Sequence, residues 1–254
     1  MMEILKDITT ARSRFREITK SGKTLGLVPT MGALHEGHLS LVHQAAADND
    51  MVAVSIFVNP AQFDNSDDLK VYPRDLEADR NILKKTAADL IFYPSTEDIY
   101  PDNYHYQVIE TENSLQLEGA YRKGYFDGVL TVVLKLLNIA GADRAYFGEK
   151  DWQQLSLIKG MTQAFFMNTE IVSCSTVREN DGLAMSSRNA LLSPSERKIA
   201  PNFHRILTSP LTPEDKTSQL ENAGFTVDYI KEMEGRVLGA VHLGRVRLID
   251  NVEI

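Results

Sequence analysis

The chain has 254 residues, of which 43% are hydrophobic and 24% are charged, and this composition fits one large globular domain or two of unequal size. Its net charge of −8 argues against a nucleic-acid partner, but a few cations placed in a cleft can still bind a small anion. The single cysteine, Cys174, excludes an intrachain disulfide.

The first twenty residues mix charged and apolar side chains at helical spacing and lack the apolar core of a signal peptide. No apolar run approaches the roughly 18 residues that a membrane-spanning helix needs. We therefore expect a soluble, cytoplasmic protein without a membrane partner.

Short apolar segments alternate with longer segments of helical periodicity. Strands are predicted at Leu25–Val28, Met51–Val58, Asp89–Tyr93, Arg144–Phe147 and Ile171–Cys174, the first of them closed by Pro29. Helices are predicted at Leu39–Ala47, Asp75–Ala87, Gly128–Ile139 and Trp152–Met167. This alternation predicts an α/β fold with a parallel sheet, helices on both faces, and ligands beyond the carboxyl ends of the strands.

The tail of the chain has a different pattern. A helix at Ser195–Leu207, a proline-rich turn at Ser209–Pro213, a short segment at Phe225–Val227, a helix-like stretch and a last strand at Val246–Ile249 are predicted. Because this tail is too small for a robust core of its own, we expect an α+β lobe packed against the sheet. The expected domains are 1–176 and 177–254.

Two histidines open the helix predicted after the first strand, in the segment VPTMGALHEGH. His35 and His38 are three residues apart, so their rings face the same side of the helix. A helix N-terminus attracts anions, and the pair is therefore a candidate phosphate site. A metal pair and two capping or exposed histidines remain alternatives, although the spacing differs from HExxH and no third metal ligand is evident.

Polar residues also follow the predicted strands at 51–58 and 144–147. In SIFVNPAQF, Asn59 and Gln62 are neutral groups suited to a carboxylate or hydroxyl, although the segment taken alone also fits a plain turn. In YFGEKDWQQL, Lys150 can neutralise phosphate charge. Its neighbours Glu149 and Asp151 could accept from ribose hydroxyls or hold Mg²⁺ through water, Gln154 could face a substrate, and an ordinary charged helix start is the alternative.

The last motif is VRENDGLAMSSRNALLS. Ser186, Ser187 and Arg188 supply two hydroxyls and a guanidinium fork that matches phosphate oxygens. The alternative is that the segment is the N-cap region of the next helix, with Ser193 or Ser195 as the capping residue.

Together the motifs resemble the HIGH and KMSKS elements of the nucleotidylyltransferase superfamily, and within it the pantoate–β-alanine ligase family. The resemblance rests on PTMGALHEGH, SIFVNPAQF, YPRDLEAD, LEGAYR, FGEKDWQQL, DGLAMSSRN and RLIDN, which follow one another in that family's order from Leu25 to Asn251. It implies a Rossmann-like domain with a small C-terminal lid, in an enzyme that is typically a homodimer. The implied reaction joins pantoate and β-alanine at the expense of Mg-ATP, through a pantoyl adenylate.

The resemblance also implies roles for individual residues. The residues that it implies for ATP binding are Pro29, Thr30, Met31, Gly32, Ala33, Leu34, His35, Glu36, Gly37, His38, Gly148, Glu149, Lys150, Asp151, Val177, Met185, Ser186, Ser187 and Arg188. His38 is the position of the catalytic proton donor, and His35, Lys150 and Arg188 act with it on the phosphates. The residues that bind pantoate are Gln62, Gln154 and Asn59, and Gln62 also binds β-alanine.

The chain departs from the family pattern at several positions. Tyr125 and Asp127 stand where histidine and arginine are usual, Ala61 stands where methionine is common, and the C-terminal lobe is short. Two other readings remain, a different nucleotidylyltransferase of the superfamily and a non-catalytic homologue that only binds ATP.

Overall fold

The computed structural model describes residues 2–63, 69–70 and 72–254. The chain forms two compact units. The first, called the sheet unit here, comprises Met1–Leu34, His38–Gly148 and Gln153–Cys174. The second, called the C-terminal unit, comprises Ser175–Ile254 together with two short segments from the motifs, His35–Gly37 and Glu149–Trp152.

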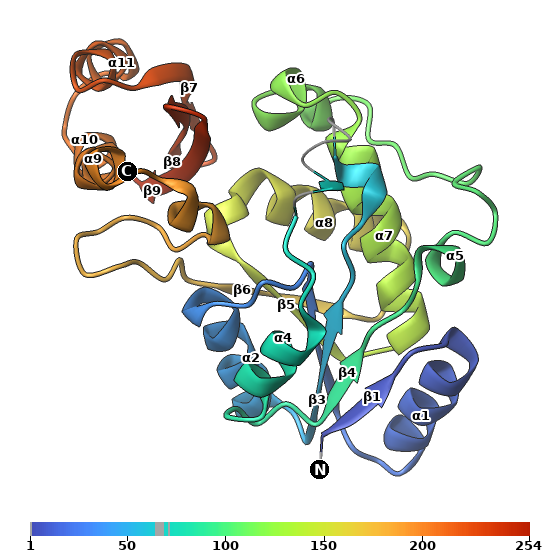
Figure 1. The fold of residues 1–254 in the computed structure, drawn as a ribbon. Helices are drawn as coiled ribbons and strands as arrows, with labels where there is room; N and C mark the ends of the chain where they lie inside the picture. Colours follow the sequence, from blue (N-terminus) through green and yellow to red (C-terminus); the bar gives the residue numbers. More distant parts are fainter. Residues whose placement is uncertain (1, 64–68, 71) are drawn as a thin grey trace. The chain divides into compact units, whose positions relative to one another are not determined.

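A parallel sheet of six strands forms the centre of the sheet unit (Figure 1). Its strands are β1 (Glu3–Leu5), β2 (Leu25–Thr30), β3 (Met51–Ile56), β4 (Leu90–Phe92), β5 (Arg144–Gly148) and β6 (Glu170–Cys174), in the spatial order β1-β4-β3-β2-β5-β6. The strand order reverses direction between β2 and β5. This is the topological switch point at which open α/β sheets bind ligands.

Two details of the sheet differ from the sequence prediction. The strand β1 was not predicted, because three residues are too few to show a period. Pro29 does not close β2 but lies inside it, in register with Ser55 of β3. β2 pairs with β5 only at Gly26 and Leu27, so beyond them its other side is open and the missing N–H of a proline is tolerated.

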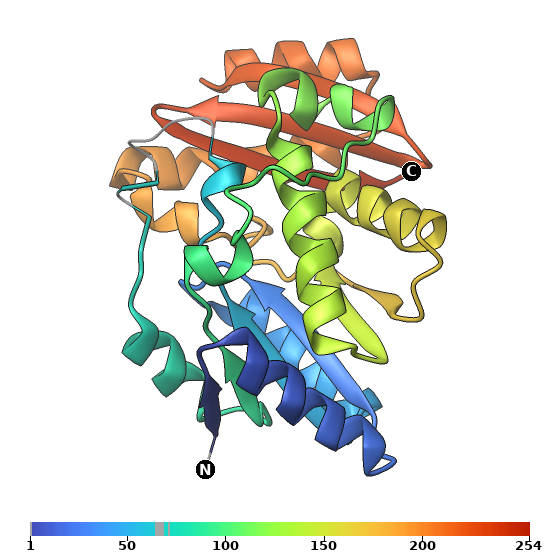
Figure 2. The ribbon, with the colours of Figure 1, turned by 90° about the vertical axis from the view of Figure 1, so that its right-hand side faces the viewer.

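Helices cover both faces of the sheet (Figures 1 and 2). α1 (Ile8–Lys20) and α7 (Tyr125–Ala140) pack together on one face. α2 (Glu36–Asp48) and α4 (Leu76–Leu83) contribute to an apolar cluster on the other, with Val42 and Leu83 packed among strand residues. The described part of the sheet unit also contains the helices α5 (Thr96–Ile99), α6 (Glu118–Tyr121) and α8 (Trp152–Ala164) and the 3-10 turns η1 (Pro60–Gln62) and η2 (Asn113–Leu115). The 3-10 turn η3 (Glu149–Asp151) and Trp152, the first residue of α8, cluster with the C-terminal unit.

The C-terminal unit is built on an antiparallel sheet in the order β7-β8-β9, whose strands are shown lengthwise in Figure 2. Its elements are η4 (Ser187–Leu191), α9 (Pro194–Ile199), α10 (Pro201–Leu207), α11 (Pro213–Asn222), β7 (Thr226–Met233), β8 (Arg236–Leu243) and β9 (Val246–Glu253). Phe203, Leu207 and Val241 belong to a buried apolar cluster formed within this unit. The expectation that the tail lacks a core of its own is therefore wrong.

Three further predictions for the tail need correction. The single helix expected at 195–207 is two helices, because Pro201 has no N–H to donate and starts a new helix instead. The proline-rich turn ends at Pro213, which begins the unpredicted helix α11. The helix-like stretch after Val227 is a β-hairpin, whose turn residues Glu234 and Gly235 both have the positive φ that such turns require.

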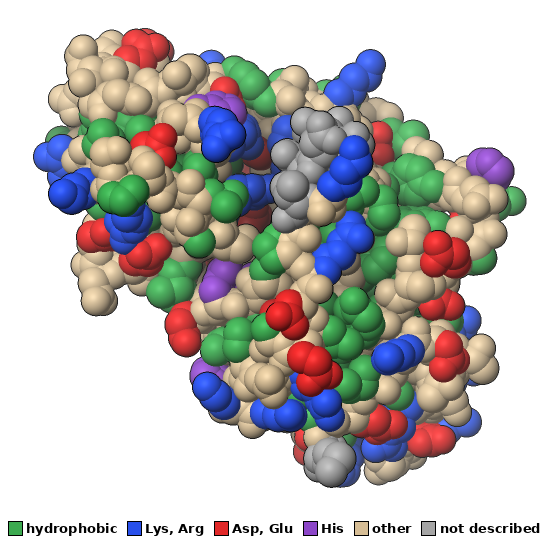
Figure 3. All heavy atoms as spheres, in the orientation of Figure 1, with side chains coloured by type: hydrophobic (Ala, Val, Ile, Leu, Met, Phe, Trp, Pro, Cys, Tyr) green, Lys and Arg blue, Asp and Glu red, His purple; other side chains and the backbone are tan. Residues whose placement is uncertain are grey.

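In the described part of the chain, no helix is long and apolar enough to cross a membrane. On the face drawn in Figure 3, basic and acidic side chains are interspersed over the sheet unit.

Candidate functional site

The loop after β2 carries the first motif, and a buried carboxylate holds its shape. Asp79 of α4 accepts hydrogen bonds from the backbone N–H groups of Ala33 (3.1 Å) and Leu34 (2.8 Å). Gly32 has φ +81°, and a Cβ on it would lie 2.8 Å from an Asp79 carboxylate oxygen, so only glycine fits there. Burial raises the pKa of Asp79 although both N–H donors oppose this. Sequence reasoning gave Asp79 no role, and its only signal was a place in YPRDLEAD.

His35 lies immediately before α2, in a segment that clusters with the C-terminal unit. The N–H of Gly37 donates to His35 Nδ1 over 3.1 Å, so the neutral ring carries its proton on Nε2. Burial lowers the pKa of His35, and the charge of Lys150 lowers it further. The ring therefore favours its neutral form, in which Nε2 is a hydrogen-bond donor.

The segment after β5 presents Lys150 between two acidic residues. Lys150 Nζ lies 3.8 Å from an Asp151 carboxylate oxygen, and 19% of the lysine side chain is exposed. Glu149 instead pairs with Arg236 of β8 at 3.1 Å. Of the two acids proposed for ribose or Mg²⁺, Glu149 is thus engaged by a protein cation.

The third cationic segment is the loop around Arg188, which is exposed at the start of η4. Ser186 caps η4, because its hydroxyl accepts from the Arg188 N–H at 3.2 Å. The capping alternative is confirmed for Ser193, whose hydroxyl accepts from the Glu196 N–H at 3.3 Å at the start of α9. The hydroxyl proton of Ser186 remains available to donate.

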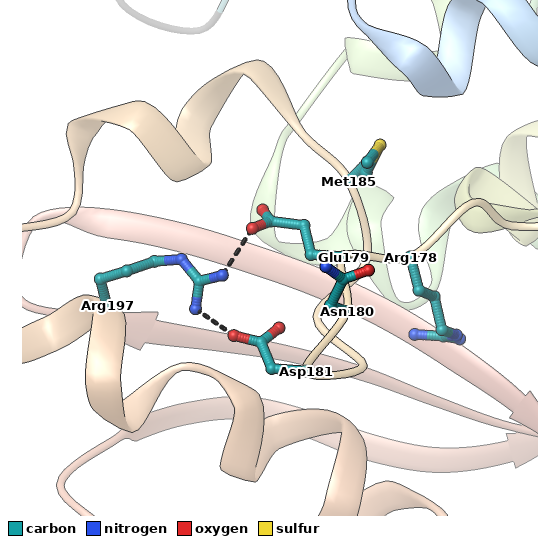
Figure 4. A pocket seen from close by; sticks show the side chains of 6 residues that line it. All are labelled: Arg178, Glu179, Asn180, Asp181, Met185 and Arg197. Atoms are coloured by element: carbon teal, nitrogen blue, oxygen red, sulfur yellow. Dashed lines mark hydrogen bonds and ion pairs between the residues drawn. The ribbon is translucent and has the colours of Figure 1, made fainter.

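A cavity of about 360 Å³ opens within the C-terminal unit beside this loop (Figure 4). Arg197 bridges Glu179 and Asp181 across it, and Met185 of the last motif faces it. Its lining residues are Arg178, Glu179, Asn180, Asp181, Met185 and Arg197.

In the sheet unit, the amide of Asn59 is fully buried and has a fixed orientation. Its Oδ1 accepts from the Ala61 N–H (3.3 Å) and the Tyr100 hydroxyl (2.7 Å), and its Nδ2 donates to the Gly128 carbonyl (3.1 Å). A backbone N–H can only donate and a carbonyl can only accept, so the two ends of this amide cannot be exchanged. Asn59 is 0% exposed.

This orientation is passed on to Gln62. Asn59 Nδ2 also donates to Gln62 Oε1 at 2.9 Å, so the oxygen of the Gln62 amide is held by the protein. The Nε2 end, with two hydrogens, is the one that remains for a ligand. Gln62 therefore acts as a donor, which suits a carboxylate or hydroxyl oxygen.

Arg122 links the two candidate glutamines. Its Nη2 donates to the backbone carbonyl of Gln62 (3.0 Å), and its guanidinium lies 3.6 Å from the centre of the Tyr125 ring. The Tyr125 hydroxyl in turn donates to Gln154 Oε1 at 3.2 Å. Sequence reasoning gave no role to Arg122 or Tyr100, and only the LEGAYR motif contained a signal for Arg122.

Among residues 2–63, 69–70 and 72–254, there is no group of three or more histidine, cysteine, aspartate or glutamate side chains placed to hold a metal ion.

The sheet unit is an open parallel sheet with polar loops at its switch point, and the oriented amides of Asn59 and Gln62 follow the neighbouring strand β3. This combination defines an α/β enzyme that acts on small molecules.

Comparison with known proteins identifies the family of this enzyme. A family model described as pantoate-beta-alanine ligase matches residues 3–253. A pantothenate synthetase of Bdellovibrio bacteriovorus is 52% identical over 92% of this chain and 94% of its own length. One of Legionella pneumophila is 48% identical, over 94% of each chain.

Solved structures agree. A pantoate-beta-alanine ligase of Francisella tularensis, complexed with beta-gamma ATP and beta-alanine, has a TM-score of 0.93 at 42% identity, over 100% of this chain and 98% of that one. Pantothenate synthetase of Thermus thermophilus has a TM-score of 0.90 at 38% identity, over 99% of both chains. The chain belongs to the pantoate–β-alanine ligase family, and it is a ligase that condenses pantoate with β-alanine.

Proposed function

We propose that this chain drives the condensation with ATP through a pantoyl adenylate, using the residues that the motifs single out. One observation carries the proposal: the segments with His35 and Lys150 follow β2 and β5, the two strands that flank the switch point of the sheet. The Francisella relative, whose structure contains an ATP compound and β-alanine, supports ATP and β-alanine as substrates here.

In the first step, a pantoate carboxylate oxygen attacks the α-phosphorus of ATP and pyrophosphate leaves. A carboxylate is already ionised at pH 7, so the step needs alignment and charge neutralisation rather than an enzymic nucleophile. We assign the neutralisation to Lys150 and Arg188, with His38 as proton donor and His35 as a neutral donor through Nε2. In the second step, the β-alanine amine attacks the acyl carbon and AMP leaves.

Pantoate is assigned to Gln62 and Gln154. The free end of Gln62 is a donor, and a neutral donor can hold the carboxylate without forming an ion pair that would lower its reactivity. Because Asn59 is fully buried, we propose that it supports Gln62 and does not touch pantoate itself.

Mg²⁺ fits this site only as part of the nucleotide complex. With Glu149 paired to Arg236, Asp151 is the carboxylate of its segment that would hold the ion, through water and together with the phosphates of the nucleotide. When bound, Mg²⁺ would neutralise charge on the leaving phosphates.

Tyr125 and Asp127 replace a histidine and an arginine usual in the family. Tyr125 places its hydroxyl on Gln154, so we propose that it orients this glutamine. With Lys150 and Arg188 carrying the phosphate charge, Tyr125→His with Asp127→Arg should change substrate affinity by about 1 kcal/mol or less. Steady-state kinetics of the double variant measure this, and a hundredfold gain in turnover would contradict the assignment.

The larger-scale assignments are also proposals. We infer a homodimer in the cytoplasm, in which residues 177–254 act as a lid over the nucleotide. Light scattering after size-exclusion chromatography tests the dimer, and a monomer at micromolar concentration would exclude it.

A coupled assay for AMP, with pantoate and β-alanine omitted in turn, tests the reaction. Full turnover should need both acids, and pantoate alone should support exchange between ATP and pyrophosphate. His38→Ala should lower both rates about 10²–10³-fold, the scale of losing one transition-state donor. Pyrophosphate release without AMP would indicate another nucleotidylyltransferase, and ATP binding without turnover a non-catalytic homologue.

A further inference from the structure

The terminal motif RLIDN is not used by the chemistry above, yet two of its residues are among the most buried polar groups in the C-terminal unit. Asp250 and Asn251 of β9 are each 3% exposed. A buried polar side chain is stable only when it is hydrogen-bonded, so the partners of these two residues indicate what they hold in place.

Asn251 holds the segment that bears Lys150. Its Nδ2 donates to the backbone carbonyls of Glu149 (2.8 Å) and Lys150 (3.0 Å), one hydrogen for each. Its Oδ1 accepts from Arg236 Nη1 at 2.8 Å. Carbonyls only accept and a guanidinium only donates, so this amide, like that of Asn59, can take only one orientation.

Arg236 reinforces the same segment from β8. Its guanidinium pairs with Glu149 (3.1 Å) and lies 4.0 Å from the centre of the Trp152 ring. Trp152 Nε1 also donates to Glu234 Oε2 at 3.1 Å. Both ends of the segment 149–152 and the main chain between them are thus fixed to the β7–β9 sheet. Among the described residues, the Lys150 side chain itself forms no hydrogen bond or ion pair with that sheet.

Asp250 extends the arrangement to the last motif. It accepts two hydrogen bonds from Arg178, at 2.7 and 2.9 Å, and Arg178 also donates to the Asn251 carbonyl at 3.2 Å. Arg178 forms an isolated antiparallel β-bridge with Ala184, and Ala184 directly precedes Met185 of the last motif. Asn251 therefore holds the segment of Lys150, and its neighbour Asp250 holds the start of the segment that leads to Arg188.

We propose that Asn251, supported by Arg236, is a positioning residue that sets the place of Lys150 in adenylate formation. The proposal rests on the phosphate role of Lys150 proposed above. Fixing the main chain of a lysine restricts the positions that its ammonium group can reach, and a displacement of about 1 Å from the productive position can cost about a hundredfold in rate.

The discriminating substitution is Asn251→Asp. It keeps the size of the side chain and the oxygen that faces Arg236, and it replaces the amide that donates to the carbonyls of Glu149 and Lys150 with an acceptor oxygen that both carbonyls repel. We expect the kcat of pantoate-dependent ATP–pyrophosphate exchange to fall about 10- to 100-fold, with KM values for ATP and pantoate within about threefold of wild type. The matched control is Arg247→Ala, at another position of β9, which removes an ion pair with Asp228 of β7. Its kcat should stay near the wild-type value.

A double-mutant cycle separates positioning from a general effect on the unit. If Asn251 acts through Lys150, Asn251→Asp should cost less than about twofold more in a Lys150→Ala background. Losses that multiply, or an Asn251→Asp variant within twofold of wild type, would overturn the proposal. Lys150→Ala alone tests the proposed role of the lysine, so failure of that role is seen separately.

If a variant of Asn251 is too unstable for kinetics at the assay temperature, a spectroscopic measurement still tests the proposal. Because Lys150 helps to keep the pKa of His35 low, Asn251→Ala, which removes the two donations without adding a charge, should move the His35 titration toward its ordinary value. NMR in the cold measures this titration, and an unchanged His35 titration in folded Asn251→Ala would count against a displaced Lys150.

Discussion

At the scale of single residues, the orientation of the Gln62 amide is the most consequential feature. Its oxygen is held by Asn59, so it offers pantoate a donor only. Gln62→Ala should lower kcat/KM for pantoate about ten- to a hundredfold, the effect of one lost hydrogen bond to a charged group, about 1.5–3 kcal/mol. Direct ATP binding, measured by calorimetry, should hardly change.

Gln62→Glu gives the sharper comparison. It preserves the oxygen that accepts from Asn59 and replaces the donor with a second acceptor, so it should be at least as damaging as alanine. Gln44→Ala, at an exposed glutamine of α2 that bonds Asp48, is the control. A Glu variant that binds pantoate normally, or a collapse of ATP affinity, would mean that the donor end does not face pantoate.

His35 makes a prediction about pH. Its pKa in the folded protein lies below the ordinary value of 6.5, because of burial first and the Lys150 charge second. Near that pH the folded protein therefore binds fewer protons than the unfolded chain, and the stability contributed by His35 is lost as the pH falls through 6.5 toward the folded pKa.

NMR of the His35 ring protons should show the lowered pKa, and Lys150→Ala should raise it. Lys198→Ala removes the same charge elsewhere in the C-terminal unit and should leave the titration in place. A His35 that titrates at or above 6.5 in the wild type would contradict the buried, neutral ring.

At the scale of elements, the approach of α7 to η1 depends on a glycine. A Cβ on Gly128 would lie 2.3 Å from the Ala61 carbonyl oxygen, and the Gly128 carbonyl accepts from Asn59. Gly128→Ala should therefore push η1 away, lower the melting temperature and raise the pantoate KM together. Gly160→Ala in α8 is the matched control, since nothing lies within 4 Å of a Cβ there.

The control should stabilise the protein by about 0.5–1 kcal/mol, because alanine is the better helix former. Thermal melts and pantoate kinetics of the two variants decide the matter. If Gly128→Ala were as stable and as active as Gly160→Ala, the contact between α7 and η1 would not be as close as described.

At the scale of the whole molecule, each unit has a core of its own. Phe203, 1% exposed, packs in the C-terminal unit with Phe225 at 6.2 Å between ring centres, and Phe15, also 1% exposed, packs edge-on against Phe92 in the sheet unit. Replacing either with alanine should cost about 3–5 kcal/mol locally.

Hydrogen exchange should then separate the units. Phe203→Ala should cost protection mainly within residues 194–253, and Phe15→Ala mainly in β1, β2, β4 and α1. Equal loss of protection in both units from both substitutions would mean that the chain unfolds as one cooperative block.

The sequence by itself determined the parallel sheet, because five strands and four helices alternate with clear periods, and it determined the family, because seven motifs occur in one order. It could not show β1, which has three residues, or tell two helices from one at Pro201. It misread the β7–β8 hairpin because the hairpin depends on pairing and on the backbone at Glu234 and Gly235.

Only the tertiary structure decided which polar groups hold one another. Asp79 and Ala33, Asn59 and Tyr100, and Asn251 and Lys150 are from 41 to 101 residues apart in the chain, and no local pattern joins them. A hydrogen bond depends on atoms meeting within about 3 Å, whereas periodicity reports only which face of an element is apolar. The motifs therefore named residues that can bind substrate, and the fold assigned the neighbours that orient them.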